Sequence, residues 1–312
     1  GYHIREAGST EIQELSFTFA NAIAYVEAAI KKGMDPNKFG HRISFFFNSH
    51  NGFLEEIAKF RAARKIWATI MKERFLVTNE KALYCRFHVQ TGGSTLTAQQ
   101  IDNNIVRTSI QALAAVLGGA QSLHTNSKDE ALSLPSVDSA QTALRTQQII
   151  AHESGVTNYP DPLGGSYVIE KMTQNFFTKS MKKIDEIDSM GGAIEAINNG
   201  FIEREISKSA YQYQQMLDSE KKIIVGVNKF QNKEEHSGEL LDIDLEKVRL
   251  QIKDLANYKN SRDNNHVGTA LENLKCTAES SKNIMPDIIH CVKNDCTLGE
   301  ISDVLRTVFS EY

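Results

Sequence analysis

The sequence lacks both the basic excess and the long apolar runs that would place it on a nucleic acid or in a membrane. Its 312 residues carry 35 Lys and Arg against 39 Asp and Glu, a formal net charge of -4. Proteins that bind nucleic acid or anionic lipid usually show a basic excess instead. No apolar run reaches the roughly 20 residues needed to cross a bilayer. We therefore expect neither nucleic acid nor membrane among its partners.

Cysteine is also scarce. The chain has four, none of them in a CxxC pair: Cys85, Cys276, Cys291 and Cys296. Residues scattered in this way predict neither a zinc site nor a disulfide framework. We expect no metal ion bound by the side chains of this chain, and a reducing, cytoplasmic setting.

What the sequence does contain is a repeated strand–helix unit. Short, nearly continuous apolar segments at 42–48, 83–89 and 119–125 are typical of buried strands. Each is followed by a segment with helical apolar spacing, the second over about 97–117. Such units predict an α/β fold with a parallel sheet, either a barrel or an open doubly wound sheet. With a strand that ends at 1–3, about four units are present, half of what an eight-stranded barrel needs.

The strand signal fades after this part of the chain. A loop rich in proline and glycine begins at Tyr159, and helical patterns follow it. From about Lys233 the chain becomes strongly charged before two or three more amphipathic helices. We expect three regions: a half barrel over 1–158, a helical region packing on it over 159–232, and a polar linker with C-terminal helices over 233–312.

Polar side chains punctuate the predicted strands. They are His3 at the end of the first, Arg42 and Ser44 within the second, His88 and Gln90 closing the third, and His124, Asn126 and Glu130 after the fourth. Because the carboxyl ends of parallel strands face one crevice, we expect these groups to converge there. A single histidine at a strand end is more often a hydrogen-bonded structural residue than a functional one. For three histidines at successive strand ends, the structural and functional interpretations carry equal weight.

Simpler interpretations remain for the other polar features. Arg42 could pair with a carboxylate of a neighbouring helix instead of binding an anion. The Thr91–Ser94 segment could be only a tight turn between strand and helix, and not a phosphate-binding loop. A charged helix face would by default meet solvent or form salt bridges between helices; it comprises Glu55, Glu56, Lys59, Arg61 and Arg64. A metal hydrolase could use His3, His88, His124 and Glu130, although no HxH or HExxH spacing occurs.

Several long segments resemble the methylmalonyl-CoA mutase family, in the C-terminal half of the catalytic barrel of its large (alpha) subunit. The family includes isobutyryl-CoA and 2-hydroxyisobutyryl-CoA mutases. The resemblance is specific up to about residue 230 and weaker beyond. The matching segments, in chain order, are GYHIREAG (1–8), RISFFFN (42–48), EEIAKFRAAR (55–64), FHVQT (87–91), STLTAQ (94–99) and QSLHTNSKDEA (121–131).

This resemblance implies a (β/α)₈ barrel that threads an acyl-CoA along its axis and is closed at one end by adenosylcobalamin. It implies an isomerase, an intramolecular transferase that rearranges the carbon skeleton of a branched acyl-CoA by radical chemistry. By position, His3 would hydrogen-bond the thioester carbonyl. Arg42 and Ser44 would line the acyl-CoA path, with His88 and Gln90 beside the substrate. Gln121 and Ser122 would line the same cavity, and Asn126 and Glu130 would hold the adenosyl ribose.

The resemblance also implies what this chain does not supply. The family's N-terminal half barrel is absent, and so is the Asp-x-His-x-x-Gly motif that carries the lower cobalt ligand. We therefore expect a hetero-oligomer with a half-barrel chain or missing segment and a cobalamin-binding subunit, and no activity without them. The residues present here do not specify the acyl group. One alternative is a non-catalytic half-barrel assembly or docking module, and the other is a component of an isobutyryl-CoA or 2-hydroxyisobutyryl-CoA mutase.

Overall fold

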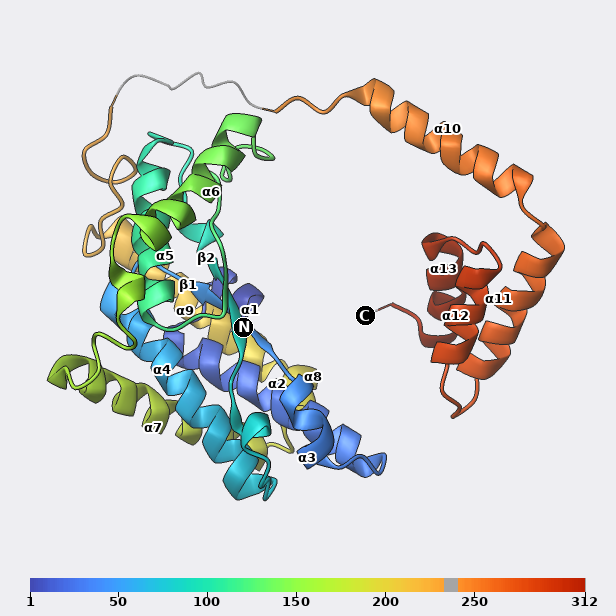
Figure 1. Cartoon of the computed structure of the whole chain (residues 1–312), viewed down its shortest axis with the longest axis horizontal. Helices are drawn as coiled ribbons and strands as arrows, with labels where there is room; N and C mark the ends of the chain where they lie inside the picture. The colour runs from blue at the N-terminus through green and yellow to red at the C-terminus, as the bar shows by residue number, and fades with distance from the viewer. Residues whose placement is uncertain (233–240, 312) are drawn as a thin grey trace. The chain divides into compact units, whose positions relative to one another are not determined.

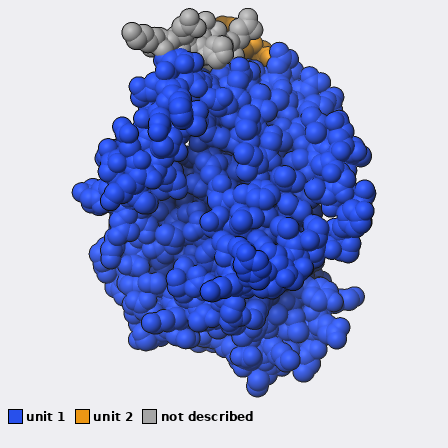
Figure 2. All heavy atoms as spheres, turned by 90° about the vertical axis from the view of Figure 1, so that its left-hand side faces the viewer, with its two compact units in different colours: residues 1–241 blue, residues 242–312 orange. Residues whose placement is uncertain are grey.

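The structure, a computed structural model, describes residues 1–232 and 241–311. The chain divides into two compact units, Gly1–Leu241 and Asp242–Tyr312. The larger unit carries the sheet and most of the helices (Figure 1, and blue in Figure 2). Each unit is described by itself.

A three-stranded parallel sheet lies at the centre of the larger unit. Strands β1 (Phe45–Ser49), β2 (Phe87–Thr91) and β3 (Ser122–His124) lie side by side in chain order. Helix α4 (Phe53–Thr69) connects the first pair, and α5 (Asn103–Leu117) connects the second. The predicted α/β organisation with parallel strands is therefore confirmed for these units. The arrangement is compatible with part of a barrel.

The strand predicted at the start of the chain was wrong. Residues Tyr2–Glu6 form a short helix, α1, in which the Arg5 N–H donates to Gly1 O at 3.1 Å. The ring of Tyr2 stacks on the ring of Phe46 in β1, with centroids 4.7 Å apart. This contact places α1 against the sheet, and the described residues hold three parallel strands in place of the expected four.

Two predicted boundaries also moved. The second strand begins at Phe45, because Gly40–Arg42 form a 3-10 turn ahead of it. Helix α5 begins at Asn103 rather than near residue 97, because Gln100 has a φ of 50°, which no helix accommodates. Both changes move polar residues out of regular elements and into the turns beside the sheet.

One face of the sheet forms the apolar core. Phe45 and Phe47 point into it together with Phe87, and all three are buried. Trp67 of α4 meets Phe45 at a centroid distance of 4.9 Å, and Phe19 of α2 (Glu11–Lys31) meets it at 5.1 Å. Burying side chains of this size contributes about 2 kcal/mol each. The helices therefore cover this face and leave the other to the polar residues described below.

The remaining helices pack around this core. Helix α7 (Tyr167–Ser189) lies along α2 and α4, and α6 (Val137–His152) lies beside α5. The other elements of the larger unit are α3 (Pro36–Phe39), α8 (Ala193–Asn198), α9 (Phe201–Asp218) and the short turns Ile70–Arg74, Glu80–Leu83, Gly93–Thr95 and Val156–Asn158.

The smaller unit is helical, with α10 (Leu245–Ser261), α11 (Asn264–Ala278), α12 (Met285–Lys293) and α13 (Leu298–Phe309). The last three enclose a small core around Leu274 and Ile301. Glu300 takes part in two contacts that stabilise the smaller unit. It closes the capping box of α13 with Thr297 and accepts two hydrogen bonds from the Arg262 guanidinium, at 2.5 and 2.8 Å.

We expect Glu300→Ala to destabilise α13 by about 2 kcal/mol, because it removes charge-assisted bonds and half of a cap. The Arg262 hydrogen bonds hold the pKa of Glu300 well below its ordinary 4.5. This stabilisation is therefore present above about pH 4.5 and is lost as the pH falls below it. Amide hydrogen exchange over 298–309 measures the effect. Asp303→Ala removes an exposed ion pair to Arg306 from the same helix, and should change exchange little.

Candidate functional site

The second face of the sheet carries a ladder of polar and aromatic side chains. Phe46 of β1 lies opposite His88 of β2, which lies opposite Ser122 of β3. One step further along, Asn48, Gln90 and His124 form a second row. Alternate residues of a strand point to opposite faces, so both rows share the face that turns away from the apolar core.

His3 joins this face from helix α1. Its ring is exposed and meets the edge of the Phe46 ring at a centroid distance of 6.3 Å and an angle of 88°. Phe46 in turn contacts the ring of His88 at 5.1 Å. Over the described residues, no hydrogen bond engages the His3 imidazole. The ring is thus held by aromatic contact, and its nitrogen atoms have no hydrogen-bond partner among the described residues.

The two histidines of the sheet are held neutral. His88 Nδ1 lies 2.7 Å from Ser122 Oγ. Burial lowers the pKa of His88, and the repulsion that a protonated His124 would exert lowers it further. Burial also lowers the pKa of His124. Both imidazoles therefore lie uncharged on this face at neutral pH, each with one N–H donor and one acceptor.

The carboxyl edge of the sheet gathers amide groups. Gln90 Nε2 donates to Asn126 Oδ1 at 2.9 Å, and Asn126 Nδ2 donates to Thr91 O at 3.1 Å. Asn126 is buried, whereas Glu130 is exposed and lines a cavity of about 200 Å³ with His124. Burial of the carboxyl group, and then the charge of Asp129, raise the pKa of Glu130. In the part of the chain that the structure describes, no partner binds its carboxylate oxygens.

Arg42 and Ser44 do not share this edge, which corrects the expected convergence. Both are exposed and precede β1, so they lie toward its amino end. No described carboxylate pairs with Arg42, which leaves its guanidinium available. Gln121 precedes β3, and its Oε1 accepts the Phe87 N–H at 2.6 Å. That side chain caps the amino end of β2 and has less freedom to meet a ligand.

Sequence reasoning did not single out three residues near the carboxyl edge of the sheet: Tyr2, Glu6 and Gly93. Glu6 Oε2 accepts the Ser94 N–H at 2.8 Å, and Glu6 Oε1 accepts the Asn48 Nδ2 amide at 2.5 Å. Burial, followed by the charge of Glu6, raises the pKa of Tyr2 to about 12. A Cβ added at Gly93 would lie 3.1 Å from both the Glu6 carboxylate and the Asn126 amide, so glycine permits this close approach. Glu6 and Tyr2 lie inside the GYHIREAG segment, so the family resemblance of that segment could have pointed to them.

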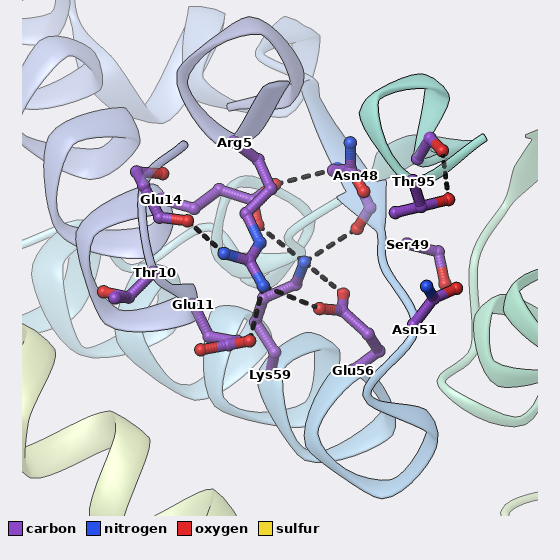
Figure 3. A network of polar contacts seen from close by, with 12 residues as sticks. Arg5, Thr10, Glu11, Glu14, Asn48, Ser49, Asn51, Glu56, Lys59 and Thr95 are labelled. Carbon is purple, nitrogen blue, oxygen red and sulfur yellow. Dashed lines mark hydrogen bonds and ion pairs between the residues drawn. The ribbon is translucent and has the colours of Figure 1, made fainter. Parts of the chain in front are cut away.

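A buried ionic cluster lies beneath the end of β1 (Figure 3). Lys59 is completely buried, and its Nζ lies 2.6 Å from Glu14 Oε2 and also contacts the buried Glu56. The Arg5 guanidinium joins the cluster from α1, 2.5 Å from Glu11. Lys59 and Glu56 of the charged α4 face therefore form buried salt bridges. Salt bridges were one of the two simpler interpretations of this face, the other being exposure to solvent. Burial raises the pKa of Glu56 to about 7.

The metal-hydrolase alternative has no geometric support. Among the described residues, no three His, Cys, Asp or Glu side chains gather where they could hold a metal ion. His3, His88, His124 and Glu130 are spread over the face and edge of the sheet and do not converge on one point.

Comparison with known proteins decides the family. A family model described as methylmalonyl-CoA mutase matches residues 1–311. The chain belongs to the methylmalonyl-CoA mutase family. The resemblance carried by the sequence segments is thereby confirmed, and it extends across nearly the whole chain.

The relatives within this family include two kinds of mutase. The chain is 44% identical to the 2-hydroxyisobutanoyl-CoA mutase large subunit of Aquincola tertiaricarbonis, over all of this chain and 56% of that subunit. It is 43% identical to mitochondrial methylmalonyl-CoA mutase of Homo sapiens, over all of this chain and 42% of that protein. The mouse enzyme gives the same values. The chain spans about half the length of the curated relatives it matches.

In this member of the methylmalonyl-CoA mutase family, none of the helices in the described part of the chain is long and apolar enough to cross a membrane. The matched range includes His3, His88, Gln90, Ser122 and Asn126.

Proposed function

We propose that this chain is a catalytic component of an adenosylcobalamin-dependent acyl-CoA mutase, which isomerises the carbon skeleton of a branched acyl-CoA. The observation that carries the proposal is the polar face of the sheet. Uncharged histidines, a hydroxyl and amides stand there in two rows, on a chain of the mutase family. Neutral hydrogen-bonding groups suit a thioester because their N–H and O–H donors can orient its carbonyl oxygen.

The opposite ends of the face receive different parts of the substrate in this proposal. Arg42 and Ser44, near the amino end of β1, bind the phosphate and pantetheine portions of the CoA. His3, His88 and Gln90 then surround the acyl group. The His3 N–H donates to the thioester carbonyl and stabilises charge that gathers on this oxygen during rearrangement. Threading the acyl-CoA along the sheet explains why the predicted residues lie at both ends.

The carboxyl edge would hold the adenosyl group. Glu130 presents an exposed carboxylate without a protein partner among the described residues, and such a group accepts hydrogen bonds from both ribose hydroxyls. Asn126 lies at the same edge, where Gln90 fixes its amide. These residues fit the cofactor. When bound, adenosylcobalamin supplies the radical that abstracts a substrate hydrogen.

The remaining parts of the enzyme come from elsewhere in this proposal. β1 and β3 are the outer strands of the sheet, and on the polar face Ser122 and His124 are exposed while His88 and Gln90 are half-buried. Among the described residues, no further strand pairs with the outer edge of β3, and an open strand edge of this kind calls for a partner. A further barrel segment or chain would cover this edge and the polar face, and a cobalamin-binding subunit would provide the lower cobalt ligand. The assembly is then hetero-oligomeric. A cytoplasmic setting stays a prediction, since some relatives are named as mitochondrial.

The test is reconstitution with the proteins encoded beside this chain. With adenosylcobalamin added, the assembly should convert either methylmalonyl-CoA or 2-hydroxyisobutyryl-CoA into its linear isomer, resolved by chromatography of the thioesters. Samples without the cofactor, or without this chain, are the controls. Assembly of the complete complex without isomerisation of any branched acyl-CoA would favour the non-catalytic module.

A further inference from the structure

Glu6 is held at the carboxyl edge of the sheet by Asn48 of β1 and by Ser94 in the turn that follows β2. Its carboxylate lines a cavity of about 560 Å³ between α1, the β1–α4 turn and α9. Oε2 is fixed by the backbone N–H of Ser94, and Oε1 accepts from the Asn48 amide at 2.5 Å and from Ser94 Oγ at 3.3 Å. Among these contacts, Asn48 is the one that ties Glu6 to β1.

Asn48 is itself held with unusual firmness. The backbone groups of Phe45 and Ser49 bond toward β2, so those of Asn48 point to the other edge of β1. There the Asn48 N–H donates to Glu14 Oε1 at 2.8 Å, and Asn48 O accepts from Lys59 Nζ at 2.7 Å. Two buried, oppositely charged side chains thus satisfy the backbone groups at this point (Figure 3).

The side chain of Asn48 has one hydrogen-bonding task. It is completely buried, and its Oδ1 has no hydrogen-bond partner among the described residues. A buried amide oxygen without a partner carries a cost of about 1–3 kcal/mol. A leucine of similar volume would avoid this cost, so the amide is explained by the bond that its Nδ2 makes to Glu6.

We infer that Asn48 is a positioning residue of the proposed mutase site, which fixes the Glu6 carboxylate in place at the cavity. The inference rests on the proposed function for its catalytic meaning. Glu14 and Lys59 hold the backbone of Asn48 at the outer edge of β1, and the Asn48 side chain orients Glu6. The buried cluster therefore has a task at the site besides stabilising the fold.

The Asn48 bond favours the ionised form of Glu6. Burial raises the pKa of Glu6, the Ser94 and Asn48 hydrogen bonds oppose this rise, and the charge of Glu130 adds to it. Removing the Asn48 donor should therefore raise the pKa of Glu6 further. The other titratable or charged groups that face this carboxylate or line its cavity are Tyr2, Arg5, Glu11, His50, Glu55, Tyr213 and Lys222.

The direct test is the titration of Glu6 in the full chain labelled with ¹³C at glutamate carboxyl groups, its signal assigned by its loss in Glu6→Gln. In Asn48→Ala the midpoint should move to higher pH. Ser49→Ala is the matched control, because it removes a buried hydrogen bond to Gln111 from the next residue of the same strand. An unchanged Glu6 midpoint in Asn48→Ala would overturn the inference.

Two further variants guard against a folding defect. Asn48→Leu keeps the buried volume and should shift the Glu6 midpoint as Asn48→Ala does. Glu6→Gln leaves Asn48 in place, and the side-chain amide proton of Asn48 should move upfield once its charged acceptor is gone. An amide signal that does not move would show that no such bond orients Glu6.

The catalytic arm uses the reconstituted enzyme. Asn48→Ala should lower kcat/KM about tenfold and move the acidic limb of its pH profile upward, as expected for one charge-assisted hydrogen bond. Ser49→Ala should leave that limb in place. A normal profile in an active Asn48→Ala enzyme contradicts the positioning role. If the wild-type assembly shows no turnover, the proposed function fails, and the titration still decides whether Asn48 orients Glu6.

Discussion

His3→Ala should lower kcat of the reconstituted enzyme by a factor of about 10²–10³, with little change in KM. The reason is that removal of a single donor to a developing oxyanion has effects of this size. The ring has no other hydrogen-bonding task in the described residues, and it is held against Phe46 by aromatic contact. Steady-state isomerisation of the acyl-CoA at saturating cofactor measures the loss.

The controls separate chemistry from folding. His3→Gln keeps an N–H donor on a flexible side chain and should recover part of the rate. His152→Ala removes an exposed histidine from the end of α6 and should leave kcat unchanged. Equal turnover of His3→Ala and the wild type would show that His3 does not bind the thioester carbonyl.

Lys59→Met should destabilise the larger unit by about 3–5 kcal/mol, a large part of the stability of an ordinary domain. The methionine keeps the stem of the side chain but leaves Glu14 and Glu56 buried without their shared cation. Urea unfolding followed by the fluorescence of Trp67 measures the loss. Trp67 is the single tryptophan, and it is completely buried beside the sheet.

The loss should depend on pH in a defined direction. The folded pKa of Glu56, about 7, lies above its ordinary 4.5, so the stability contributed by its protonation is present below 4.5 and is lost as the pH rises through 7. The positive charge of Lys59 lowers the pKa of Glu56. Without Lys59 this pKa rises, so the stability contributed by protonation of Glu56 is lost only at a higher pH. Lys59→Met should therefore be closer to the wild type at pH 5 than at pH 8.

Lys65→Met provides the comparison for this variant. Lys65 lies on the same helix, is exposed and donates to Gln174, so its replacement should change the stability by no more than about 0.5 kcal/mol. Equal unfolding midpoints for the two variants would show that the buried cluster is not held together by Lys59.

The sequence predicted the strands of the site better than its edges. The apolar segments around Phe47, Val89 and Leu123 lie in the three observed strands, because strands buried on one face by helices leave a strong pattern. Alternation then assigns His88 and Gln90 to the opposite face. The first strand failed because residues 1–3 are too few to show a period, and the stacking of Tyr2 on Phe46 is a tertiary contact.

The buried charges were beyond sequence reasoning for a different reason. Glu14, Glu56 and Lys59 occupy helices whose exposed faces are also charged, so nothing in their spacing marks them as buried. Glu14 and Lys59 also bond the backbone of Asn48, a contact that no side-chain pattern reports. For the same reason Glu6 passed unnoticed, although its neighbour His3 was singled out.

The most direct test of the account is protection of the polar sheet face by the substrate. Ser122→Cys places a thiol on that face, and alkylation by iodoacetamide is followed by mass spectrometry in the reconstituted enzyme with and without acyl-CoA. The native Cys276, exposed in the smaller unit, is the internal reference. Acyl-CoA should slow alkylation at position 122 and leave alkylation of Cys276 unchanged. Equal alkylation at position 122, in an assembly that turns over its substrate, would contradict it.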